Sequence, residues 1–150
     1  MITVLNSGAY VLNGTEIVTD EKEYVDTADL DVARMVAELS TYKGRSGTAC
    51  PGVGDWLSAF EGYDEIYCVT IISTLSGSYN SALTAKQQYE EEHPGAKVFV
   101  LDSYSAGAEM KLHLEKIRDL VLEGLSFENI CFTFGTNGCF DKTVAIIFNV

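Results

Sequence analysis

Serine hydroxyls surround a glycine in the segment TIISTLSGSYNSA, residues 70–82, where a β-branched apolar stretch passes into a helical pattern. Ser76 and Gly77 lie at this junction, and the segment contains no lysine, histidine or acid. Neutral O–H and N–H donors at a helix start suit a small anion, because the unpaired N–H groups carry a partial positive charge. The loop RSGTACPG, residues 45–52, repeats this chemistry. The sequence therefore predicts a carboxylate or phosphate site.

Nucleotide binding and hydrolysis fit these residues less well. A P-loop needs a lysine after its last glycine, and none follows Gly77. The stretch GVGDWL, residues 52–57, has two glycines of a dinucleotide fingerprint but lacks the third. A serine nucleophile needs a histidine, and we expect both His93 and His113 on polar helical faces. A serine hydrolase therefore remains a minor alternative, and no catalytic residue is assigned.

The simplest alternative is that Ser76 or Ser78 only caps a helix, which is worth about 1 kcal/mol of stability. A single cap uses one hydroxyl, whereas this segment contains several and the loop at 45–52 adds more. The surplus favours a binding site over a cap.

Apolar runs of strand length alternate with helical patterns along the chain. The sequence predicts strands at residues 2–5, 65–72 and 97–101, and helices at 30–42, 78–92 and 109–124. The continuous apolar runs are typical of strands covered on both faces. This alternation predicts an α/β fold with a mostly parallel sheet and flanking helices.

Local signals refine these predicted elements. Asp29 or Thr27 is expected to cap the helix at 30–42, and Ser126 a further helix that starts with SFENI. The glycine-rich segment at 43–56 is predicted to be a loop, in which Pro51 suits the first turn of a short helix.

The acidic composition excludes several partners. Ten basic and 22 acidic residues give a formal net charge of −12, which opposes binding to nucleic acid or to anionic membranes. No apolar run is long enough for a membrane span, and the N-terminal stretch lacks the features of a signal peptide. We expect a cytoplasmic protein.

The four cysteines show no metal-ligand spacing, so no metal and no cofactor are expected. Cys68 and Cys131 lie in apolar runs and are expected to be small buried hydrophobic residues of a reducing compartment.

Three motifs in order and spacing resemble the DegV family of bacterial fatty-acid-binding proteins. They are KGRSGTACPGVGDWLSAF, YDEIYCVTIISTLSGSYNSA and VFVLDSYSAGAEM, and the resemblance spans about residues 16–130. It implies an N-terminal α/β domain that buries an acyl chain and a second domain that covers the head group. Residues 1–138 would form the first domain, with a shortened first-strand region, and 139–150 the start of a truncated second domain.

The resemblance also implies a ligand and its contacts. Thr48 and Ser76 would hold the fatty-acid carboxylate with their hydroxyls, and the Gly77 amide would lie nearby. Ala49 and Gly52 stand where the family has hydroxyl-bearing residues. The protein would be a carrier of long-chain fatty acid that presents its ligand to a separate fatty-acid kinase and is not itself an enzyme. The alternative is a structural or interaction remnant with an incomplete ligand site.

The last quarter departs from the alternation. Residues 131–142 show no helical period, and TVAIIFNV at 143–150 is predicted to be a strand. We expect this strand either to pair with a neighbour or to leave an exposed edge.

Overall fold

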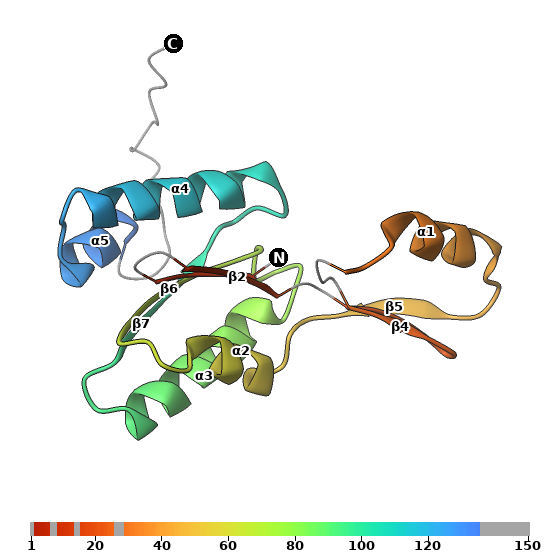
Figure 1. Cartoon of the computed structure of the whole chain (residues 1–150), viewed down its shortest axis with the longest axis horizontal. Coiled ribbons are helices and arrows are strands. Elements are labelled where there is room, and N and C mark those ends of the chain that lie inside the picture. The colour runs from red at the N-terminus through yellow and green to blue at the C-terminus, as the bar shows by residue number, and fades with distance from the viewer. Residues whose placement is uncertain (1, 7–8, 14–15, 26–28, 136–150) are drawn as a thin grey trace, which may run out of the picture.

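A computed structural model of the chain describes residues 2–6, 9–13, 16–25 and 29–135 (Figure 1). In chain order the elements are β1 Ile2–Asn6, β2 Ala9–Asn13, β3 Glu16–Thr19, β4 Glu23–Tyr24, α1 Val32–Thr41, β5 Ser46–Ala49, α2 Val53–Phe60, β6 Glu65–Thr70, α3 Ser78–Glu92, β7 Lys97–Asp102, α4 Ala108–Leu122 and α5 Phe127–Thr133.

Two sheets organise the described strands. The larger has the order β2-β1-β6-β7, in which β1 pairs antiparallel with both of its neighbours and β6 pairs parallel with β7. The smaller has the order β4-β3-β5 and is antiparallel throughout. The α/β class with flanking helices is confirmed, but the larger sheet is mixed, so the prediction of a mostly parallel sheet is not confirmed.

Helices cover both faces of the larger sheet (Figure 1). Side chains of β6 alternate between the faces, as the pleat of a strand requires. Ile66 and Cys68 pack into a core with α2 and α3. Tyr67 and Val69 pack into a second core with α4 and α5. Coverage of both faces explains the unbroken apolar sequence of β6, even though only one strand pair is parallel.

The smaller sheet and α1 lie to one side of this layered body (Figure 1). No residue of α1 is fully buried, and Val32 and Val36 are more than half exposed. The connection to the layered body is short, because β5 ends at Ala49 and α2 begins at Val53.

The helix predictions are largely confirmed. The predicted helix at 78–92 is α3, and those at 30–42 and 109–124 correspond to α1 and α4. Ser126 caps α5 as expected, accepting a hydrogen bond from the Asn129 N–H at 3.4 Å. Pro51 directly precedes the Gly52 N-cap of α2 instead of lying inside its first turn.

Several local predictions were wrong. Asp31 caps α1 instead of Asp29, because its Oδ1 accepts from the Arg34 N–H at 3.0 Å; Thr27 lies outside the described residues. The predicted loop at 43–56 contains strand β5, whose small residues pair with β3. This strand is mostly exposed and so carries no apolar alternation.

At the C-terminal end of the described chain, α5 continues through Cys131 to Thr133, into a segment predicted to have no helix. Helix α5 has only seven residues, too few for a helical period to be recognised in the sequence. Its N-cap and its packing against α4 stabilise it. The predicted strand at 143–150 and the domain boundary at 138 lie outside the described residues.

At Val98, two side chains of α3 bind the backbone of β7 on the side away from β6. Glu90 Oε1 accepts from the Val98 N–H at 2.8 Å, and the Lys86 ammonium donates to the Val98 carbonyl. Lys86 and Glu90 also form an ion pair at 3.0 Å. Both backbone groups that Val98 turns away from β6 are therefore satisfied.

Shortening Ile66 tests the first core, because its side chain is fully buried between β6, α2 and α3. We expect Ile66→Ala to lower the free energy of unfolding by about 2 to 5 kcal/mol and Ile66→Val by about 0.5 to 1.5 kcal/mol. Urea denaturation followed by circular dichroism measures both values. Equal stability of Ile66→Ala and the original chain would contradict this packing.

Candidate functional site

Two of the residues predicted to bind an anion, Ser76 and Gly77, follow the carboxyl end of β6. The parallel register from Glu65↔Lys97 to Thr70↔Asp102 brings both strand ends to one edge of the sheet. The segment after β6 leads into α3, and the segment after β7 leads into α4. Ligands of open α/β sheets bind at this kind of edge.

Ser76 and Gly77 occupy the turn before α3. The Ser76 side chain is half-buried, its hydroxyl lies 2.9 Å from that of Ser78, and it accepts from the Ser78 N–H at 3.2 Å. The N-cap of α3 is Gly77, without a side-chain cap bond, so neither Ser76 nor Ser78 is the cap that the simpler alternative proposed; Ser76 lies one residue earlier and bonds the first N–H of the helix. The next N–H groups of α3, on Tyr79 and Asn80, belong to the first turn, where no preceding turn supplies a carbonyl.

Thr48 lies on another element, strand β5. It is exposed and pairs with Ile17 of β3. Together with Arg45 and Asp20 it lines a hollow of about 430 Å³ on the smaller sheet, and neither Ser76 nor Gly77 is among the residues that line this hollow.

The segment after β5 nevertheless contacts the start of α3. The Ser81 hydroxyl donates to the Pro51 carbonyl at 2.9 Å. A Cβ built on Gly77 would lie 3.1 Å from Cys50 Sγ, a close approach that glycine permits. The structure thus links strand β5, which carries Thr48, to the turn of Ser76 and Gly77 through Cys50 and Pro51.

The two histidines do not lie where the sequence predicted. His113 is on the buried side of α4, with 8% of its surface exposed, so its assignment to a polar face was wrong. Burial lowers the pKa of His113, and a hydrogen bond with the Ser103 backbone partly opposes this. His93 is half-buried and stacks on Tyr89 at the end of α3 opposite Ser76.

The cysteines follow the prediction in part. Cys68 is fully buried and burial raises the pKa of its thiol, as expected for a small hydrophobic residue. Cys131 is only half-buried, since it lies near the margin of α5, and burial raises the pKa of its thiol to about 11.

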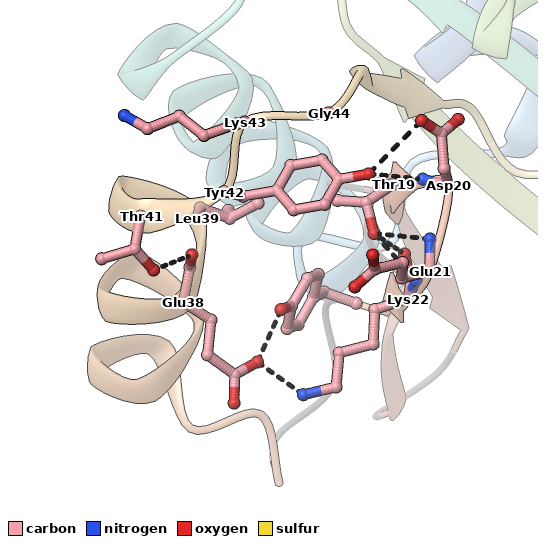
Figure 2. A pocket seen from close by; sticks show the side chains of 11 residues that line it. Thr19, Asp20, Glu21, Lys22, Glu38, Leu39, Thr41, Tyr42, Lys43 and Gly44 are labelled. Carbon is pink, nitrogen blue, oxygen red and sulfur yellow. Dashed lines mark hydrogen bonds and ion pairs between the residues drawn. The ribbon is translucent and has the colours of Figure 1, made fainter.

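A larger hollow of about 670 Å³ lies between α1 and the β3–β4 hairpin (Figure 2). Glu38 is its central group, accepting from Lys22 Nζ at 2.5 Å and from the Tyr24 hydroxyl at 2.6 Å. Its other oxygen accepts from Arg34 Nε at 2.8 Å. These donors, Lys22 first, lower the pKa of Glu38 to about 2.

Tyr42 makes the second connection across this hollow. Its hydroxyl accepts from the Asp20 N–H at 3.2 Å and donates to the Asp20 carboxylate at 3.4 Å. Polar contacts, with Glu38 and Tyr42 at their centre, thus hold α1 and the segment after it to the hairpin. The sequence analysis missed this cluster; the i, i+4 spacing of Arg34 and Glu38 was its only local signal.

Metal and membrane sites can be judged for the part of the chain that the structure describes. There, no group of three or more histidine, cysteine, aspartate or glutamate residues is placed to hold a metal ion. None of the described helices is both long and apolar enough to cross a bilayer.

Comparison with known families gives a match over residues 6–134, to a family described as "uncharacterised protein, DegV family". The chain belongs to the DegV family. A DegV domain-containing protein of Streptococcus pneumoniae is 47% identical over 110 residues, which are 73% of this chain and 39% of that protein. This DegV chain therefore spans about two fifths of the length of that relative.

Solved DegV structures share the fold. A DegV family protein from Eubacterium eligens, described as loaded with heptadecanoic acid, superposes with a TM-score of 0.78 at 47% identity. The Streptococcus pneumoniae Fatty Acid Kinase B3 protein, described as loaded with linoleic acid, gives 0.77 at 43% identity. Each match covers 81% of this DegV chain, and 44% and 43% of the respective solved chains.

Ionisation of Glu38 tests the hollow between α1 and the hairpin. Because its folded pKa is lowered from 4.5 to about 2, its stabilising contacts are complete above pH 4.5 and are lost as the pH falls toward 2. We expect Tyr24→Phe to raise the pKa of Glu38, since one donor to the carboxylate is removed. Carboxyl NMR titration measures this value.

The matched control for that titration is Tyr42→Phe, because the Tyr42 hydroxyl bonds Asp20 and not Glu38. It should leave the pKa of Glu38 unchanged. Equal pKa values for Glu38 in all three chains would show that the Tyr24 contact is absent in solution.

The approach of Cys50 to Gly77 is tested by a double-mutant cycle. We expect Gly77→Ala to be less favourable by about 1 kcal/mol when Cys50 is present than in a Cys50→Ala chain, because only the former meets a crowding Sγ. Urea denaturation of the four chains measures this coupling. Gly54→Ala is the control, since no atom lies within 4 Å of its added Cβ and it should show no coupling.

Proposed function

We propose that this chain binds one long-chain fatty acid, with the carboxylate at the start of α3 and the acyl chain in an apolar interior. The observation that carries the proposal is the family membership together with two relatives above 40% identity that are described as loaded with fatty acids. The chain's own residues supply suitable chemistry for the acid group.

The head group is assigned to three residues. Thr48 and Ser76 donate their hydroxyls to the carboxylate, and the Gly77 amide adds a third donor. Two features support this assignment: Ser76 and Gly77 directly precede a 15-residue helix, and Cys50 and Pro51, which follow the strand of Thr48, contact the start of that helix. A helix start favours an anion by about 0.3 to 2 kcal/mol.

Affinity comes mainly from the acyl chain. Burial of one methylene contributes about 0.8 kcal/mol, so about fifteen methylenes give about 12 kcal/mol before entropic and desolvation costs. Each hydrogen bond to the charged carboxylate contributes about 1.5 to 3 kcal/mol. The donors therefore set the orientation of the acid, and the local donors outweigh the screened net charge of −12.

The chain acts as a carrier and performs no chemistry on its ligand. The support is the relative described as the B3 protein of a fatty acid kinase, in which a protein loaded with linoleic acid is connected with a kinase. We propose that this chain likewise presents its fatty acid to a fatty-acid kinase. Residues 1–138 form the lipid-binding domain in this proposal, and 139–150 begin a second one.

Extraction of the purified chain tests the proposal directly. We expect organic-solvent extracts to contain long-chain acids by mass spectrometry, and the delipidated chain to take up oleic acid. Absence of both would favour the alternative, a remnant with an incomplete ligand site.

Removal of the Ser76 hydroxyl tests the head-group assignment. We expect Ser76→Ala to weaken binding of oleic acid about tenfold, the value of one charged hydrogen bond, and to change binding of methyl oleate much less. Isothermal titration calorimetry measures both ligands. Ser126→Ala is the control, because it removes the N-cap of α5, another helix, and should change neither. Equal losses for acid and ester in Ser76→Ala would remove Ser76 from the assignment.

A further inference from the structure

The segments after β6 and β7 are joined beyond the end of the parallel ladder. The Ser103 N–H donates to the Thr70 carbonyl at 3.1 Å, and the Ile72 N–H donates to the Ser105 carbonyl at 2.9 Å. The first loop therefore rests on the second at its base.

Asp102 makes the next connection between the two loops. Asp102 is 3% exposed. It accepts from the Ser73 N–H at 3.2 and 3.3 Å, and from the Tyr104 N–H at 3.0 Å through Oδ1. A buried carboxylate needs such donors to offset its lost hydration. Asp102 is thus a fixed acceptor shared by both loops.

The turn that carries Ser76 starts at the residues held in this way. The N–H groups of Leu75 and Ser76 both donate to the Ile72 carbonyl, at 3.0 and 3.3 Å. The N–H groups of Ile72 and Ser73 are in turn held by the second loop. The position of the Ser76 hydroxyl therefore depends on the base of this turn.

The second loop adopts an unusual conformation around the same carboxylate. Tyr104 has φ +52°, a left-handed conformation that is uncommon for a residue with a bulky side chain. Its N–H is one of the two backbone donors to Asp102. Strained backbone of this kind persists where surrounding contacts enforce it, often beside functional sites.

We propose that Asp102 is a positioning residue for the carboxylate end of the ligand. It touches no ligand atom; it holds the Ser73 amide and so sets the direction of the Ser76 hydroxyl and the Gly77 amide. This inference rests on the proposed function of the chain. The negative charge of Asp102 weakens the binding of an anionic ligand, whereas its positioning of the donors strengthens it. The two effects on affinity are therefore opposite and can be separated by substitution.

Three replacements separate the two effects. Asp102→Asn keeps the Oδ1 acceptor, which can serve both N–H donors, and loses the charge. Asp102→Glu keeps the charge and displaces the acceptor by one methylene. Asp102→Ala loses both. If positioning dominates, the Asp102→Asn variant should bind oleic acid with an affinity within threefold of that of the original chain. The Asp102→Glu and Asp102→Ala variants should bind it at least tenfold more weakly.

The preference for acid over ester gives the readout that a structural role would not move. Delipidated full-length chains are titrated with oleic acid and with methyl oleate by calorimetry. In the Asp102→Glu and Asp102→Ala variants we expect the affinity for the acid to fall at least tenfold and the affinity for the ester to fall less than threefold. Ile130→Val, a change in the buried core of α5, should lower thermal stability and leave the ratio unchanged. Asp119→Ala, an exposed acid paired with Arg118 at 2.9 Å, should change neither.

Each outcome decides between the two proposals. If the original chain binds neither ligand, the proposed function fails. If it prefers the acid and both Glu and Ala variants keep that preference, the positioning role of Asp102 is overturned. If the Asp102→Ala variant does not fold, the difference in acid affinity between the Asp102→Asn and Asp102→Glu variants decides whether Asp102 has the positioning role. Failure of all three variants to fold would overturn the inference, because Asp102 would then be a purely structural group.

Discussion

The parallel pairing of β6 with β7 is the constraint on which the rest of the site depends. Because the two strands run in the same direction, their following segments leave the sheet at one edge. The hydroxyl-rich turn before α3 and the loop of Asp102 can therefore share hydrogen bonds. Strand β1 pairs antiparallel with both β6 and β2 and extends the sheet on the other side of β6.

Two different kinds of interaction stabilise the two parts of the chain. The larger sheet is held by apolar burial on both faces, with fully buried residues such as Trp56 and Ile117. The smaller sheet and α1 are held mainly by polar contacts around Glu38 and Tyr42. Partly exposed ion pairs contribute little each and are weakened by salt. Thr48 lies on this second part, while Ser76 belongs to the first.

This division has a consequence for the proposed head-group site. Thr48 lies on the smaller sheet, whose polar contacts are weakened by salt and acid. Ser76 lies beside the larger sheet, whose apolar core is not weakened in this way. The contacts of Pro51 and Cys50 with α3 are what join the two. The geometry of the donors therefore depends on a short connection, not on a continuous core.

The sequence predicted those elements whose signals are local. The helix at 78–92 and the cap at Ser126 follow from neighbouring residues, and the apolar run at 65–72 shows that β6 is covered on both faces. Strand direction is not local, because the same apolar run suits a mixed or a parallel sheet. Strand β5 was missed because an exposed strand of small residues has no apolar alternation.

The candidate site shows the same distinction. The hydroxyl cluster around Ser76 could be found from residue types, and the family resemblance added Thr48. The connection of Asp102 to the Ser73 amide spans 29 residues and follows only from strand register. The burial of His113 also depends on which side of α4 meets the sheet, and a weakly amphipathic helix leaves that side undecided.

The side-chain contacts at Val98 of β7 affect how copies of this chain can associate. An extended segment from another molecule pairs with a sheet by taking up free amide and carbonyl groups along its outermost strand. At Val98 both backbone groups are engaged by Glu90 and Lys86. A second chain that pairs there must first separate this ion pair and break two hydrogen bonds. The same two side chains that hold α3 to the sheet therefore also oppose the pairing of another chain at Val98.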